Sequence, residues 1–170
     1  MLSRRHCGRQ RGTSMIEVLV TLIIVAIGFL GLLGLQSRSI SWQRDAFERK
    51  AAAEMVEQLA ERIRANHLGF ARSDYRFALP AGEPPPPIGG CSLAGACTSR
   101  EIAQRDAALW LRDLRRRIPS AAASASPGSG LMLDVTLAWQ EPAATGASSA
   151  ACGALVPATG WQCYTTTVFP

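Results

Sequence analysis

An uninterrupted apolar run dominates the N-terminal part of the chain. From Val18 to Leu35 there is no charged residue, and one acid, Glu17, stands directly before the run. Eighteen or more apolar residues are about enough to cross the ~30 Å hydrocarbon core of a bilayer as a helix. Gly28, Gly31 and Gly34 recur at every third position, and small residues of this kind permit close helix packing in membranes. The pattern predicts a transmembrane helix, with the glycines as a packing site or as residues that such helices simply tolerate.

The helical pattern continues beyond this run but becomes amphipathic. Residues 36–67 contain neither proline nor glycine and are rich in good helix formers. Apolar residues now follow one stripe at spacings of seven and four: Ile40, Phe47, Ala51, Met55 or Val56, Leu59 and Ile63. The sequence predicts one helix from Thr13 to Asn66, about 80 Å long at ~1.5 Å per residue, which stops at Gly69. A coiled coil is the weaker alternative, because the stripe is short and lacks regularly spaced leucines.

A capping box opens a second helix. Thr98 provides the N-cap hydroxyl and Glu101 the acid three residues later. Pro119 ends the helix, and three arginines, Arg115 to Arg117, fill its last turn. We interpret these arginines as solvated charge that compensates the helix dipole, with an acidic partner or a lipid surface as the alternative. The apolar face of the helix consists of Ala103, Ala107, Trp110, Leu111, Leu114 and Ile118.

The remaining segments predict strands and loops. Residues 75–79 alternate like a short strand, and residues 80–90, PAGEPPPPIGG, form a stiff surface connector or, alternatively, a polyproline ligand. Residues 120–130, SAAASASPGSG, have the composition of a flexible linker. Residues 131–140 alternate as a half-buried strand, in which Leu131, Leu133, Val135, Leu137 and Trp139 share one face. Residues 141–159 are loop, and residues 161–169 favour a last strand. The predicted fold class is α+β, with antiparallel strands across the long helix.

Most of the net positive charge lies in the first twelve residues. The sequence has 18 Lys and Arg against 13 Asp and Glu, but Arg4, Arg5, Arg9 and Arg11 all precede the apolar run. Without them the balance is close to neutral, so the charge is a topology signal and does not indicate strong nucleic-acid binding. The N-terminus is expected in the cytoplasm and the rest of the chain on the exported side.

The cysteines fit an exported domain. Cys7 lies in the basic leader, and four more follow the apolar run: Cys91, Cys97, Cys152 and Cys163. An even number predicts two disulfides. Three pairings exist, of which we favour the local ones, Cys91–Cys97 and Cys152–Cys163. A zinc site is the weaker alternative, because the chain has no C-x-x-C pair.

The order of parts at the N-terminus is more specific than its composition. A basic leader ends at Gly12, two small hydroxyl residues and two apolar residues follow, and then comes Glu17. A secretory signal has a shorter apolar core with its cleavage site after the core. The present order resembles the leader of type IV pilins and type II secretion pseudopilins. The resemblance implies that a prepilin peptidase cleaves after Gly12 and N-methylates Thr13, and that Glu17 serves subunit assembly. Thr13 departs from the usual phenylalanine, and the long helix lacks the proline that many major pilins carry.

Later segments narrow this resemblance. The run RGTSMIEVLVTLIIVAIGFLGLLGLQ, the RIRAN segment at residues 62–66 with Gly69, Asp106 with Trp110, and a strand that ends at Trp139 are similar to minor pilins of the PilV family. The resemblance implies a low-abundance subunit that joins other minor pilins to prime type IV pilus assembly and sits at the tip. The implied partners are the prepilin peptidase, other minor pilins, the major pilin and a tip adhesin. Twitching motility and cell adhesion are the implied processes.

The resemblance also divides the chain and places it in the cell. Residues 1–12 are a cleaved leader, residues 13–36 the membrane and assembly half of the helix, residues 37–69 its amphipathic half, and residues 70–170 a periplasmic or extracellular domain. The protein is expected in the bacterial inner membrane as a single-pass chain, and then in the pilus at the cell surface.

No catalytic constellation stands out in the sequence. His67 is the only histidine after the leader, no paired carboxylates or phosphate loop can be recognised, and the four tryptophans are interpreted as core residues. We expect a structural subunit with no enzyme activity, metal or cofactor. A secretion pseudopilin and an uncleaved single-pass adaptor remain the alternatives.

Overall fold

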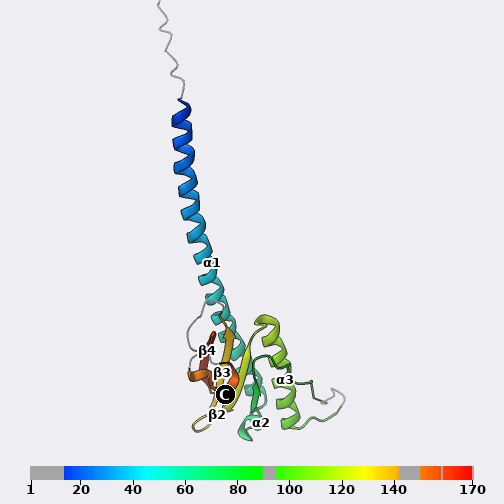
Figure 1. The fold of residues 1–170 in the computed structure, drawn as a ribbon. Helices are drawn as coiled ribbons and strands as arrows, with labels where there is room; N and C mark the ends of the chain where they lie inside the picture. The colour runs from blue at the N-terminus through cyan, green and yellow to red at the C-terminus, as the bar shows by residue number, and fades with distance from the viewer. Residues whose placement is uncertain (1–13, 90–94, 142–149, 158, 170) are drawn as a thin grey trace, which may run out of the picture. The chain divides into compact units, whose positions relative to one another are not determined.

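The structure is a computed structural model that describes residues 14–89, 95–141, 150–157 and 159–169. The chain divides into two compact units, Met1–Gln43 and Arg44–Pro170. One long helix, α1 (Met15–Ala65), contributes to both, and it is followed in Figure 1 by a short helix, a second long helix and four strands. Their bounds are α2 (His67–Ala71), β1 (Phe77–Leu79), α3 (Ser99–Arg117), β2 (Ala122–Pro127), β3 (Leu133–Gln140), the 3₁₀ helix η1 (Ala150–Leu155) and β4 (Trp161–Val168).

Helix α1 confirms the predicted single helix to within two residues at its start and one at its end. Glu17 in its first turn, with Arg62 and Arg64 in its last, matches the polarity of the helix dipole. The predicted stripe is only partly buried, because the core of the domain reaches α1 from Ala51 onward. Ile40 and Phe47 are 67% and 65% exposed, so their assignment to the packed face was wrong. The buried residues of α1 are Ala51, Ala52, Met55, Val56, Leu59, Ala60 and Ile63.

Gly69 does not stop the long helix. Helix α1 ends at Ala65, and α2 begins after Asn66, which caps it by accepting a 3.3 Å hydrogen bond from the Gly69 amide at its Oδ1. Gly69 lies inside α2 and is buried. A β-carbon there would lie 2.5 Å from Asn66 Nδ2 and 3.0 Å from the carbonyl oxygen of Ser99. The glycine therefore serves a close approach between α2 and the start of α3.

Helix α3 forms as predicted. The capping box at Thr98 and Glu101 is present in both directions, and the side chain of Glu101 accepts a 2.8 Å hydrogen bond from the Thr98 amide. Those backbone and hydroxyl donors lower the pKa of Glu101. The predicted apolar face, from Ala103 to Ile118, is buried throughout.

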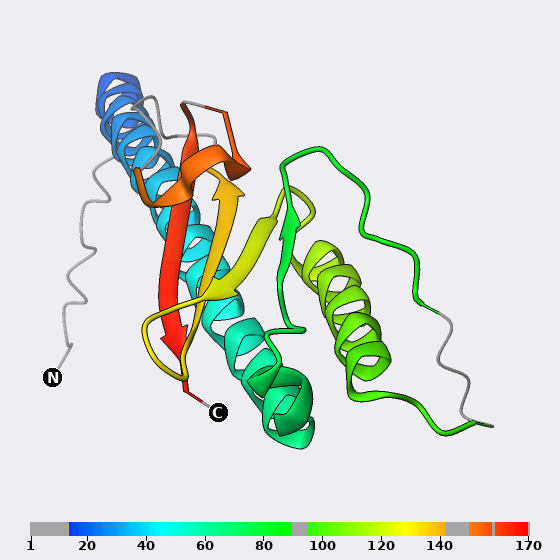
Figure 2. The same cartoon turned by 90° about the horizontal axis from the view of Figure 1, so that it is seen from below.

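Four antiparallel strands form one sheet in the order β1-β2-β3-β4. Figure 2 shows the strands side by side, with α3 next to β1. Strand β2 corrects the sequence prediction, since residues 122–127 lie in the stretch that we expected to be a flexible linker. This strand pairs with β3 from Ala122↔Ala138 to Pro127↔Leu133, and Ala122, Ala123 and Ala125 are buried. Small side chains allow this strand to pack closely, but they form no recognisable hydrophobic pattern in the sequence.

The two faces of the sheet pack against different clusters of buried residues. Leu133, Val135, Leu137 and Trp139 of β3 face the main core, where they join the buried residues of α1 and α3. Leu131, predicted on the same face, precedes the strand and is 68% exposed. The opposite face has a smaller cluster of Ala122, Ala138 and Cys152, with Ala81, Leu155, Val156, Trp161 and Cys163 packed against it.

The tryptophans divide between core and surface. Trp110 and Trp139 are buried, and Trp161 is half-buried. Trp42 is 63% exposed, so the prediction that all four are core residues was wrong for this one. Its side chain lies on the part of α1 that precedes the buried stripe.

Candidate assembly site

Glu17 lies in the first turn of α1. Its amide donates a 2.9 Å hydrogen bond to the carbonyl oxygen of Ser14, and the residue is exposed. The exposed amides of a helix N-terminus favour a nearby negative charge. Gly12 and Thr13, the predicted cleavage and methylation positions, lie outside the described residues. Cleavage and methylation therefore stay predictions.

The apolar half of α1 is exposed along its whole length. All residues from 14 to 40 are exposed, and α1 is long and apolar enough to cross a membrane by length and composition. Thr21, the one hydroxyl residue between Val18 and Leu35, donates a 2.8 Å hydrogen bond to the carbonyl oxygen of Val18 within its own helix. A surface of this kind is stable only against lipid or against other apolar helices.

The three glycines of this segment leave open space on the helix surface. A β-carbon at Gly28, Gly31 or Gly34 would meet nothing within 4 Å. A step of three residues turns an α-helix by about 300°, so the glycines follow a slanting path and not a straight line. They could accept a neighbouring helix that crosses at an angle, which remains a prediction.

A polar cluster joins the end of α1 to α3 in the domain. The Tyr75 hydroxyl donates a 2.9 Å hydrogen bond to Asp106 Oδ2, and Arg62 Nη1 lies 3.5 Å from Asp106 Oδ1. The Asn66 amide donates to the Tyr75 hydroxyl at 3.3 Å and to the Ser99 carbonyl at 2.8 Å. Burial raises the pKa of Tyr75 far above its ordinary value; the hydrogen bond from Asn66 opposes this, and the contact with Asp106 adds to it. The cluster fixes α1, α2 and α3 to one another.

Trp110 makes a second connection between α1 and α3. Its indole nitrogen donates a 2.6 Å hydrogen bond to the carbonyl oxygen of Met55, and its ring lies 5.5 Å from that of Phe77. The resemblance to minor pilins rested in part on two separate stretches of the sequence, Arg62 to Asn66 and Asp106 with Trp110. The structure brings these two stretches together at one junction. Tyr75 is fully buried at the centre of the polar cluster. Sequence reasoning missed this role, because the only signal at Tyr75 was its position in a short alternating segment.

Two of the three arginines at the end of α3 bind other segments of the domain. Arg115 donates to the carbonyl oxygens of Pro80 at 3.2 Å and Glu83 at 2.9 Å, which holds the proline-rich connector against the helix. Desolvation lowers the pKa of Arg115. Arg117 donates to Glu54 of α1 at 2.8 Å. The interpretation as solvated dipole charge was therefore wrong for Arg115, whereas Arg117 remains exposed beside its ion pair with Glu54.

The cysteines outside the leader are accounted for as far as the structure describes them. Cys152 and Cys163 form the predicted disulfide, with their α-carbons 5.6 Å apart, and it holds η1 against β4. Cys97 is also disulfide-bonded. Its predicted partner, Cys91, lies outside the described residues, so that pairing stays a prediction.

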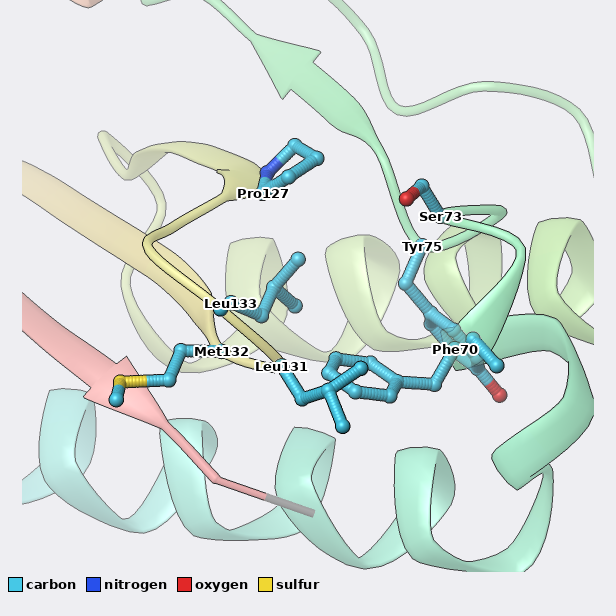
Figure 3. A pocket seen from close by; sticks show the side chains of 9 residues that line it. Phe70, Ser73, Tyr75, Pro127, Leu131, Met132 and Leu133 are labelled. Carbon is cyan, nitrogen blue, oxygen red and sulfur yellow. The ribbon is translucent and has the colours of Figure 1, made fainter.

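A small pocket lies between α2, the segment before β1 and the turn that joins β2 to β3 (Figure 3), and its volume is about 120 Å³. Leu131 points toward Phe70 at this pocket, and the lining includes no charged residue. Within the described ranges, no group of three or more His, Cys, Asp or Glu residues could bind a metal ion.

Two family models match adjoining parts of the chain. The model described as Prokaryotic N-terminal methylation motif matches residues 7–33, and the model described as Type IV pilin Tt1218 matches residues 34–108. The first match contains Gly12, Thr13 and Glu17, and the second contains the rest of α1 through the first half of α3. Neither model describes PilV minor pilins, so the resemblance to that family gains no support. No curated protein and no solved structure matches the chain.

Proposed function

The chain is a type IV pilin that carries the N-terminal methylation motif, and from this premise we propose that it is a minor pilin that primes pilus assembly and sits at the pilus tip. Type IV pilins are structural subunits of a pilus or pseudopilus, not enzymes. The observation that carries the proposal is the methylation motif in direct continuity with an exposed apolar helix that begins beside Glu17.

Processing is the first step of the proposed function. The prepilin peptidase cleaves after Gly12 on the cytoplasmic side and methylates the new amine of Thr13. The basic leader stays behind, and the retained apolar helix holds the subunit in the inner membrane with its domain on the periplasmic side. Glu17 is then the fifth residue of the mature chain.

Assembly moves the apolar helix from lipid to the packed centre of a fibre. A carboxylate inside an apolar environment is costly, at least ~2.5 kcal/mol near the bilayer centre for acidic residues. Pairing of Glu17 with the Thr13 amine of a neighbouring subunit removes most of that cost and sets the axial register of the two helices. Gly28, Gly31 and Gly34 give the neighbouring helix room to approach.

Contacts inside the domain support a role as a specialised subunit. Asp106 and Trp110 hold α3 against the part of α1 from Met55 to Arg62, so the domain presents a fixed surface of its own to other minor pilins, the major pilin and a tip adhesin. The processes served are twitching motility and cell adhesion. A subunit of the type II secretion pseudopilus is the alternative, because it would use the same leader and helix.

Processing and location test the proposal together. Wild-type protein recovered from sheared surface fibres should begin at Thr13, in low amount relative to the major pilin and at fibre tips by immunogold labelling. Gly12→Val should leave an uncleaved membrane precursor, because its side chain obstructs the peptidase. Gly8→Val, a matched change earlier in the leader, should be processed normally. Cleavage at another position, or confinement of the mature chain to the periplasm, would reject the proposal in favour of an adaptor or a pseudopilin.

A further inference from the structure

Arg38 and Trp42 form a contact pair on the exposed part of α1. They lie one helical turn apart, and the guanidinium carbon of Arg38 is 5.3 Å from the centroid of the Trp42 ring. Trp42 is 63% exposed. Within the part of the chain that the structure describes, no carboxylate lies within ion-pair distance of Arg38, whereas Arg44 pairs with Glu48 at 3.2 Å.

The position of this pair along the helix matches the thickness of a bilayer. Residues 18–37 carry no charge, and Glu17 and Arg38 stand at the two ends of that stretch. The axial distance between Glu17 and Arg38 is about 32 Å at ~1.5 Å per residue. The hydrocarbon core of a typical bilayer is ~30 Å thick. When Glu17 lies at one boundary of the core, Arg38 reaches the other and Trp42 lies just beyond it.

The chemistry of the pair fits that boundary. Tryptophan is enriched at membrane interfaces, where its ring contacts the headgroup region and its N–H finds an acceptor. An arginine that stacks through its face on an aromatic ring keeps its N–H edges available for phosphate oxygens. The same side chains at the surface of a water-exposed helix would leave a large apolar ring in water without benefit.

We propose that Arg38 and Trp42 anchor the helix in the headgroup region of the membrane, with Arg38 bound to the phosphate of an anionic lipid and the Trp42 ring beside it, just outside the boundary of the acyl chains. The pair fixes the depth of the inserted helix while the subunit waits for assembly. This inference rests on the membrane-inserted state of the proposed function. A neighbouring pilin helix is the rival occupant of the same surface.

Depth-dependent quenching of Trp42 tests the anchor. The full chain is reconstituted in vesicles of phosphatidylcholine and phosphatidylglycerol that contain lipids brominated either near the headgroup or near the chain ends. The contribution of Trp42 is the emission of wild type minus that of Trp42→Phe. Trp161→Phe, which removes a half-buried tryptophan of the domain, is the matched control. Bromines near the headgroup should quench Trp42 at least about twice as strongly as deep ones, and neither should quench Trp161.

The contribution of Arg38 has its own readout. In anionic vesicles Arg38→Gln should shift the balance between bilayer-bound and water-exposed Trp42 about fivefold toward water, the factor that one arginine contributes near an anionic surface. Arg38→Lys should keep the bound state. In vesicles of phosphatidylcholine alone the effect of Arg38→Gln should be smaller.

The outcomes separate this inference from the proposed function. If the chain stays with the vesicles after an alkaline wash but Trp42 is not quenched, or is quenched most by deep bromines, the anchor is refuted while the membrane-inserted pilin stands. If Trp42 were instead crosslinked to a second copy of the chain, the surface around Arg38 and Trp42 would be a contact between subunits. A chain that the alkaline wash removes would overturn both the anchor and the inserted state.

Discussion

Tyr75→Phe removes one hydroxyl from the junction of α1, α2 and α3 and leaves the packing of the ring unchanged. The hydroxyl donates to Asp106 Oδ2 at 2.9 Å and accepts from Asn66 Nδ2 at 3.3 Å. The amide of Asn66 keeps its 2.8 Å bond to the Ser99 carbonyl, whereas Asp106 Oδ2 loses the hydroxyl that donates to it at 2.9 Å. A hydrogen bond to a charged group contributes about 1.5–3 kcal/mol. The free energy of unfolding should fall by that amount.

Urea unfolding of the full-length chain in detergent micelles, followed by near-ultraviolet circular dichroism, measures this change. Tyr164→Phe is the matched control, because Tyr164 is the only other tyrosine and is 39% exposed on β4. Its effect should stay within about 0.5 kcal/mol, as for most surface substitutions. A loss below ~0.5 kcal/mol for Tyr75→Phe, or an equal loss for both variants, would refute the assignment of Tyr75 as the centre of the junction.

The same hydroxyl predicts a dependence on alkaline pH. Burial raises the pKa of Tyr75 above the unfolded value of about 10. The stabilising effect of the neutral phenol is therefore complete below about pH 10 and decreases as the pH rises from there toward the folded pKa. Wild type should lose stability above about pH 10, and Tyr75→Phe should lose less over the same range. Parallel curves for the two proteins would contradict this explanation.

Two further variants test the packing and covalent links of the domain by the same urea measurement. Gly69→Ala should cost about 1–3 kcal/mol, because its β-carbon would lie 2.5 Å from Asn66 Nδ2; Gly34→Ala, where a β-carbon meets nothing within 4 Å, should cost nothing. Replacement of both Cys152 and Cys163 by serine should cost about 2–3 kcal/mol, since the bridge closes a loop with a sequence separation of 11. An unchanged unfolding midpoint for Gly69→Ala would show that the neighbours of Gly69 move aside at no cost. An unchanged midpoint for the cysteine variant would show that the disulfide adds nothing to the stability.

Elements with a strong periodic pattern could be predicted from the sequence. The unbroken run of helix formers gave α1, the capping box at Thr98 gave the start of α3, and strict alternation gave the buried face of β3. The Cys152–Cys163 bridge followed from the even number of exported cysteines and their closeness in sequence. In each case the local signal and the tertiary contacts agree.

The parts that sequence reasoning missed depend on tertiary contacts. Strand β2 is made of alanine and serine, so its strand state comes from pairing with β3 and from close packing that only small residues permit. Gly69 reads as a helix stop but is required by the approach of α3. Arg115 reads as a surface charge, although the connector that passes over it supplies its carbonyl partners. None of these contacts leaves a periodic signal in the chain.

The role of Glu17 in assembly can be measured directly by the amount of Glu17→Val in sheared surface fibres relative to the membrane. Thr21→Val is the matched control, because it makes a similar change in the same segment and removes only a hydrogen bond within the helix. Both variants should insert and be cleaved after Gly12. Glu17→Val should then be absent from fibres while Thr21→Val enters them at the wild-type level. Recovery of Glu17→Val in fibres at the wild-type level would contradict the proposed pairing with the Thr13 amine.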